Sequence, residues 1–447
     1  MRKKRIVVLL VAVVLLLGQA AAAHQSVDPE STLIPFHMQV LENGLRVIVK
    51  EIPSYPIAVA NVWVGVGAKD DPDGLSGMAH FFEHLMFQGT PSRPLGQIWQ
   101  ETALLGGDIN AATSLDFTFY YIVVPSEHIR QAMEIQADAL RNSLFDQAQI
   151  DRERQVIQEE ISMVRESLQT YLLHSSLQEL FAGTSYGKPI PGTLEDLARV
   201  NRTEILDFYA RYYVPNNMVL VVAGNVVAEE IFALARELYG DLEPRPLPPP
   251  EYIEVPILER VVHKEEERPV QQSYILLAHP VPGMYTREAA ALELASVILA
   301  QGRASRLYRQ LVERERVVNS ISGWYEGFSQ VGFSVLEAEL EPGQRDRFLE
   351  IVRAELQRLQ TEPVSEEELA RAKAMVRSTV AFGTESSLNV ALFLGQAELM
   401  GGALWAVNYS AMLDQLTAED IQRAAQLYLS PDGYVHNEIR PEGGNIQ

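Results

Sequence analysis

The chain has 447 residues, of which 47% are hydrophobic and 21% charged, and its formal net charge is −22. This length and composition predict a globular protein of two domains rather than a disordered or fibrous chain. The acidic balance argues against nucleic acid, or an anionic membrane surface, as the main partner. Because the sequence contains no cysteine, it can form no disulfide, and any metal must be held by histidines and carboxylates.

The N-terminal segment has the three-part layout of a secretory signal peptide. Basic residues at positions 2–5 precede the apolar run 6–17, and small residues follow up to Ala23. We therefore expect residues 1–23 to be a signal peptide and the mature protein to be periplasmic or secreted. A retained membrane anchor is the alternative, but the apolar run is short for a span, which needs about 20 residues.

A proline-dense linker is predicted at residues 241–256, because such sequence favours extended, semi-rigid chain. It separates an N-terminal domain, 32–240, from a C-terminal domain, 257–440. Both parts mix strands with amphipathic helices, which suggests a duplicated α+β fold.

The elements expected in the first part are the strands 45–52, 57–68, 117–125 and 218–226, and helices within 77–88, 127–168 and 177–211. Those expected in the second part are the strands 273–281 and 331–340, and the helices 287–300, 345–360, 364–381 and 417–430.

The segment GMAHFFEHLMFQGT carries the main chemical signal. Ser76 is a plausible N-cap for a helix that starts at Gly77. His80 and His84 are four residues apart, so they lie on one helix face and can both reach one metal ion at about 2 Å. Glu83 lies beside them, where it could take a proton from metal-bound water. Two core histidines with satisfied hydrogen bonds are the alternative, although burying them among phenylalanines is costly unless a cation pairs with them.

The third ligand is expected on the helix around ERQVIQEE. Glu153 and Glu160 are two helical turns apart on one face, whereas Glu159 points about 100° away. Glu160 as ligand leaves an open position for water, as a catalytic zinc requires. Glu153 would stand behind the ligands and fix the tautomer of one histidine. By itself, this is an ordinary charged amphipathic helix.

The inverted motif H-x-x-E-H, followed by Glu160 76 residues after His84, closely resembles the pitrilysin–insulinase–mitochondrial processing peptidase superfamily. Further matches are GGDINAATSLDFTFYYIVVP, YGKPIPGTLEDL and FYARYYVPNNMVLVVAGNV. The resemblance implies two homologous α+β domains, each a mainly antiparallel sheet with packed helices, which together form half of a clamshell. It also implies one zinc per chain and a chamber that admits unfolded peptides.

The resemblance also suggests substrate-binding residues. The segment 107–113 would be an edge strand beside the zinc, where Asn110, Ala111 and Ala112 bind peptide backbone, although it could be a plain strand. In the C-terminal domain, which has no H-x-x-E-H, Arg306 matches a position that often serves the active site together with a tyrosine. The matching tyrosine position is Asn319 here. Arg306 could equally be a surface helix residue.

These patterns predict a zinc-dependent metalloendopeptidase that acts on peptides with Glu83 as the base. We expect a homodimer, or a heterodimer with a related non-catalytic chain that carries the Arg/Tyr pair. A non-catalytic assembly subunit and a chaperone that uses the chamber without cutting are the alternatives. His128, His174, His263 and His279 lack ligand-like spacing and are expected to be surface or core residues.

The N-terminal pattern yields a test of export. We predict that the exported protein starts near His24, because the small residues before it form a cleavage site. Cleavage removes four positive charges, which changes the formal net charge from −22 to −26. Intact mass spectrometry of the exported protein checks this, and the mass of the full precursor would instead support a retained anchor.

Overall fold

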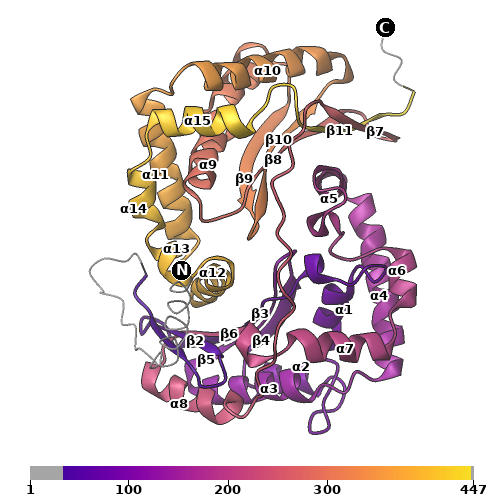
Figure 1. Cartoon of the computed structure of the whole chain (residues 1–447), viewed down its shortest axis with the longest axis vertical. Helices are drawn as coiled ribbons and strands as arrows, with labels where there is room; N and C mark the ends of the chain where they lie inside the picture. The colour runs from indigo at the N-terminus through magenta and orange to yellow at the C-terminus, as the bar shows by residue number, and fades with distance from the viewer. Residues whose placement is uncertain (1–33, 444–447) are drawn as a thin grey trace, which may run out of the picture.

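The computed structural model describes residues 34–443, so the predicted signal peptide lies outside the described residues. None of the helices within 34–443 is long and apolar enough to cross a membrane. Two sheets with surrounding helices make up the molecule (Figure 1). This arrangement confirms the α+β class with two similarly built halves.

The first sheet has six strands in the order β1-β2-β6-β3-β5-β4. Its strands are β1 (His37–Val40), β2 (Arg46–Glu51), β3 (Ile57–Val64), β4 (Asp108–Thr113), β5 (Thr118–Pro125) and β6 (Met218–Gly224). The helices of the same part of the chain are α1 (Met78–Leu85), α2 (Gln97–Leu104), α3 (Ile129–Asn142), α4 (Gln147–Glu166), α5 (Leu168–Leu180), α6 (Leu194–Arg199), α7 (Arg202–Tyr212) and α8 (Ala228–Tyr239).

The second sheet has five strands in the order β7-β11-β8-β10-β9. Its strands are β7 (Val262–Arg268), β8 (Ser273–Pro282), β9 (Ser320–Gly327), β10 (Val331–Leu340) and β11 (Val435–Pro441). The helices that follow are α9 (Arg287–Ala300), the π-helix η5 (Tyr308–Arg314), α10 (Arg345–Thr361), α11 (Glu366–Phe382), α12 (Ser387–Met400), α13 (Ala403–Val407), α14 (Tyr409–Asp414) and α15 (Ala418–Tyr428).

The two sheets repeat one plan. Strands β2-β6-β3-β5-β4 of the first sheet correspond in order to β7-β11-β8-β10-β9 of the second. In each sheet only the first of these pairs is parallel, β2 with β6 and β11 with β7, while the others are antiparallel. A repeated order with a repeated direction is the structural mark of the duplication that the sequence suggested.

The halves exchange helices across the middle of the molecule. Helix α12 of the C-terminal part packs on β3 and β6 of the first sheet, and α5 of the N-terminal part packs on β8 and β11 of the second (Figure 1). One apolar cluster therefore joins Trp63 and Val221 of the first sheet to Leu394 of α12. Because both faces of each sheet are covered, β6 is buried along its whole length.

Several predicted bounds differ from the structure. Only the short 3-10 turn η3 (Ser185–Gly187) interrupts the irregular segment 181–193, which was predicted to be helical. Strands β7 and β11 were not predicted, because β7 is almost entirely charged and β11 carries the buried polar residues His436, Asn437 and Glu438. Asn437 donates hydrogen bonds to Ser175 and Ser176 of α5, at 2.7 and 3.0 Å, so its burial depends on the other half of the chain.

The exchanged helix α12 gives a stability test. A Cβ atom on Gly395 would lie 2.1 Å from Nε1 of Trp63, and Trp63 cannot retreat because Phe117 and Phe119 pack on it. Gly395→Ala should therefore lower the free energy of unfolding by about 1–3 kcal/mol, despite the better helix propensity of alanine. Urea unfolding measures this, with Gly343→Ala as the control, because nothing lies within 4 Å of that Cβ position. Equal stability of the two variants would contradict the tight packing of α12 on the first sheet.

Candidate metal centre

Helix α1 is fixed at its start by an aspartate. The backbone N–H groups of Gly77 and Ala79 donate to the carboxylate of Asp71, at 2.6 and 2.8 Å. The prediction that Ser76 caps this helix was wrong, since no side chain at the cap position accepts such a bond. Gly77 has a φ of +95°, a left-handed conformation that favours glycine. A buried carboxylate at the positive end of the helix dipole thus holds the helix in place.

One face of α1 packs in the core, and the other face carries the polar residues of the candidate site. Five apolar side chains are buried against the first sheet and its helices: Met78, Ala79, Phe81, Phe82 and Leu85. His80, Glu83 and His84 lie on the other face and are partly buried. The apolar residues alternate with the polar ones at helical spacing, so packing the first set necessarily directs the second set toward α4 and β4.

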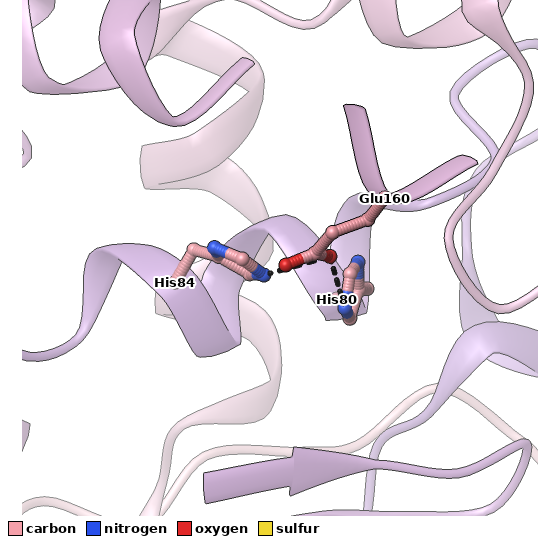
Figure 2. Close-up of side chains that lie close together, drawn as sticks. All are labelled: His80, His84 and Glu160. Carbon is pink, nitrogen blue, oxygen red and sulfur yellow. Dashed lines mark ion pairs between the residues drawn. The ribbon is translucent and has the colours of Figure 1, made fainter. Parts of the chain in front are cut away.

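The carboxylate of Glu160 on α4 lies between the two imidazoles of α1, as Figure 2 shows. Its Oε2 atom is 3.6 Å from Nε2 of His80 and 3.4 Å from Nε2 of His84. One ligand atom from each of the three residues lies within 4.8 Å of the other two, and no second such group occurs among residues 34–443. The structure thus brings together the three residues that were predicted to hold the metal.

Two features leave the imidazoles of His80 and His84 with a nitrogen that can bind a metal. Nδ1 of His84 lies 3.2 Å from Oε2 of the buried Glu153, so a proton on Nδ1 leaves the lone pair of Nε2 free for a metal. Burial and the neighbouring His84 lower the pKa of His80 to about 3, so His80 is neutral near pH 7. Glu159 is exposed, as expected from its position on α4.

Glu83 lies beside the group and is held by a residue that the sequence did not single out for this role. Oγ1 of Thr113, the last residue of β4, donates to Oε2 of Glu83 at 2.6 Å. Burial raises the pKa of Glu83, and the bond from Thr113 and the charge of His84 oppose this rise in part. The contact joins positions 30 residues apart through tertiary packing, so no sequence spacing could have revealed it.

Strand β4 lies next to the group as the edge strand of the first sheet. It pairs with β5 on one side only and packs against α1. Asn110 is exposed, and Ala111 and Ala112 are partly exposed. The open side of β4 therefore presents backbone groups beside Glu83, which is the geometry that strand addition needs.

Arg306 is not brought to the metal residues. Its guanidinium makes a bidentate ion pair with Glu368 of α11, at 2.7 and 2.9 Å, and its side chain is only 7% exposed. Asn319 is exposed at the start of β9, where its backbone N–H donates to Glu339. In this structure Arg306 links the residues before η5 to α11 within the second half, since its Nε and Nη2 both donate to Glu368, while its Nη1 is buried without a hydrogen-bond partner among the described residues.

The donor set fits zinc. Around a tetrahedral zinc with bonds of about 2.1 Å, neighbouring ligand atoms lie about 3.4 Å apart. The separations of 3.6 and 3.4 Å from Glu160 to the two histidines match that spacing. Nδ1 of His80 is buried without a hydrogen-bond partner among the described residues. Two histidine nitrogens and one carboxylate oxygen would fill three of the four positions of a tetrahedral zinc and leave the fourth open, as in catalytic zinc sites.

Comparison with known proteins supports this reading of the site. Residues 46–194 match the family model described as Insulinase (Peptidase family M16), and residues 199–376 match Peptidase M16 inactive domain. An uncharacterized zinc protease of Mycobacterium leprae is 30% identical over 393 residues, 87% of this chain and 88% of that protein.

The fold has close structural counterparts. A protease from Helicobacter pylori superposes with a TM-score of 0.85 and 22% identity, over 92% of this chain and all of that one. Pitrilysin superposes with a TM-score of 0.79 and 18% identity, over 95% of this chain but only 46% of pitrilysin. Together with the family models and the mycobacterial relative, these likenesses establish that the chain belongs to the insulinase family of peptidases, family M16.

Proposed function

We propose that this chain is a zinc-dependent metalloendopeptidase that hydrolyses unfolded peptides or small protein segments. The observation that carries the proposal is the convergence of His80, His84 and Glu160 on one point, with the carboxylate of Glu83 beside them. The relative from Mycobacterium leprae, named a zinc protease, supports the same metal and the same reaction class.

The residues divide the work of peptide hydrolysis. A zinc ion bound here supplies a Lewis acid that lowers the pKa of water and polarises a carbonyl. Thr113 donates to Oε2 of Glu83, which orients the carboxylate so that Oε1 can take a proton from the attacking water. The same oxygen then gives the proton to the leaving nitrogen. Burial raises the pKa of Glu83, which brings the carboxylate closer to the pKa of an efficient general base near neutral pH.

The substrate is proposed to bind as an added strand along β4. Backbone groups of Asn110, Ala111 and Ala112 would pair with an extended peptide and place its scissile bond beside Glu83. The small side chains at 111 and 112 leave room for the peptide chain. An extended backbone is accessible only in unfolded segments, which defines the substrate class.

A non-catalytic assembly subunit and a chaperone remain the rival functions. The second half of the chain does match an inactive domain, but the first half has a complete set of ligands together with a positioned base. Neither rival requires Glu83 to be held at 2.6 Å by Thr113, so we favour the peptidase.

We also propose that the protein is exported and that it works as a dimer. The signal-like residues 1–23 suggest a periplasmic or secreted enzyme. Because this chain spans 46% of pitrilysin, two such chains would make a molecule of pitrilysin length, which favours a dimer. Arg306 is tied to Glu368 and position 319 is an asparagine, so the partner could be a related chain that supplies the Arg/Tyr pair.

The metal ligands and the base give separable tests. We predict about one zinc per chain by plasma mass spectrometry, lost in His80→Ala, His84→Ala and Glu160→Ala. Glu83→Gln should keep the zinc but lose about 10²–10⁴-fold in peptide cleavage, because an amide cannot accept the proton.

The matched control for these variants is Glu159→Gln. Glu159 is an exposed carboxylate next to Glu160 on α4, so its loss should change neither zinc content nor rate. A Glu83→Gln variant that cleaves peptides at the normal rate would refute the role of Glu83.

Asn319 gives a test of assembly. If a tyrosine at this position normally donates to the developing oxyanion, its absence costs about 10²–10³ in rate. We therefore predict slow cleavage of extended peptides by the isolated chain, and recovery when a related chain with the Arg/Tyr pair is added. Each chain is assayed alone and both together; full activity of the isolated chain, unchanged by the partner, would show that no heteromer is needed.

A further inference from the structure

The second half contains a cavity at the position that corresponds to the metal centre. Helix α1 lies between β3 and β4 in the chain, and α9 lies between the corresponding strands β8 and β9. Likewise, α4 and α11 are each the second helix after β5 and β10, respectively. The metal group uses α1, β4 and α4, and the cavity is lined by residues of α9, β9 and α11 together with α12 to α14. The second half thus has a cavity where the first half has its metal residues, and no histidine among the described residues lines that cavity.

The cavity has a volume of about 230 Å³ and walls of aromatic rings. The aromatic and acidic residues that line it are Tyr285, Tyr325, Phe393, Trp405, Tyr409, Glu293 and Glu326. The rings of Tyr285 and Trp405 stand nearly perpendicular, with centroids 4.3 Å apart, and the ring of Tyr409 also packs on Trp405, with centroids 5.1 Å apart. The space is smaller than most drug-sized ligand sites and suits a group the size of one side chain.

Two carboxylates at this cavity have no cationic partner. Glu293 accepts a hydrogen bond from the hydroxyl of Tyr409, and Glu326 is a second lining carboxylate, exposed to solvent. Within residues 34–443, no lysine, arginine or histidine lines the cavity. Burial raises the pKa of Glu293, as expected for a carboxylate that lacks a counter-charge.

The walls are fixed before any ligand enters. Tyr285 has a φ of +73°, a strained value for a residue other than glycine. Its ring rests on the backbone of Gly401, where an added Cβ would lie 2.4 Å from the ring. The hydroxyl of Tyr325 donates to the carbonyl of Pro282 at 3.0 Å. Fixed ring faces around an acid favour binding, because little side-chain freedom is lost when a ligand arrives.

We propose that this cavity binds an alkylammonium group, either on a lysine side chain of a peptide or on a small free amine. Aromatic faces attract a cation through their quadrupole, most strongly where water is excluded. The carboxylate of Glu293 supplies the counter-charge and an acceptor for the ammonium N–H groups. A purely apolar cavity would need no carboxylate, and burying one without a partner is costly.

The test uses calorimetric titration of the full-length protein with three probes. They are N-acetyl-lysine methylamide, its neutral counterpart N-acetyl-norleucine methylamide, and n-butylammonium chloride. We expect saturable binding of a cationic probe and at least about tenfold weaker binding of the norleucine compound, since only the charge differs greatly. Binding is measured without turnover, so this result does not depend on whether the chain is a peptidase.

The variants are chosen to separate charge from packing. Glu293→Gln should weaken cation binding at least about tenfold, while Glu288→Gln on the same helix, which lies outside the cavity lining, should leave it unchanged. Trp405→Leu provides a second variant and should reduce the preference for lysine over norleucine.

The outcomes are distinct. Binding of n-butylammonium without the lysine compound supports a free amine as ligand, and binding of the lysine compound supports a peptide side chain. Equal binding of lysine and norleucine compounds, an unchanged Glu293→Gln variant, or no binding of any probe would overturn the proposal.

Discussion

The candidate site depends most on the contact between helices α1 and α4, where polar side chains of both helices meet inside an otherwise apolar region. Two imidazoles of α1 face the carboxylate of Glu160 on α4, with Glu153 behind them and Glu83 beside them. Three carboxylates and two imidazoles so close together repel or desolvate one another unless a cation joins them. Burial and the neighbouring His84 lower the pKa of His80, so this ring is neutral and its lone pair is open to a metal ion. A divalent ion balances the charge and satisfies the lone pairs.

The C-terminal half contains none of the three candidate metal ligands, but it packs against the helices and the sheet that hold them. Helix α5 begins at Leu168, two residues after α4 ends at Glu166, and α5 packs on β8 and β11 of the second sheet. Glu160 therefore lies about one and a half turns before a junction that the second half anchors. In return, α12 of the second half packs on β3 and β6 of the first sheet, toward the middle of the molecule (Figure 1). Each half thus contributes one helix to the packing of the other half's sheet.

Local patterns predicted the parts of the site that depend on local geometry. The four-residue spacing of His80 and His84 and the seven-residue spacing of Glu153 and Glu160 follow from the helical period, and the structure places all four as that period requires. The metal-binding roles themselves stay predictions until metal is measured. The superfamily resemblance supplied the fold, and the repeated sheet order agrees with it.

Features that depend on distant contacts were not predictable in the same way. The cap of α1 comes from Asp71, not Ser76, because chain folding before the helix brings that carboxylate to the N–H groups. Thr113 reaches Glu83 through sheet packing. The pattern of α12 is apolar on most sides, so it indicates burial without showing which sheet covers it. Arg306 matched a family position, yet Glu368 holds it in a salt bridge elsewhere.

Zinc X-ray absorption spectroscopy on the purified full-length protein tests most directly whether His80, His84 and Glu160 hold a zinc ion. We predict bound zinc with two imidazole nitrogens and two oxygen ligands, one from Glu160 and one from water, with zinc–ligand bond lengths of about 2.0–2.2 Å. Glu160→Ala should abolish this spectrum, because the variant loses the zinc. A protein that binds no zinc, or a zinc site whose spectrum lacks the two imidazoles, would contradict the account.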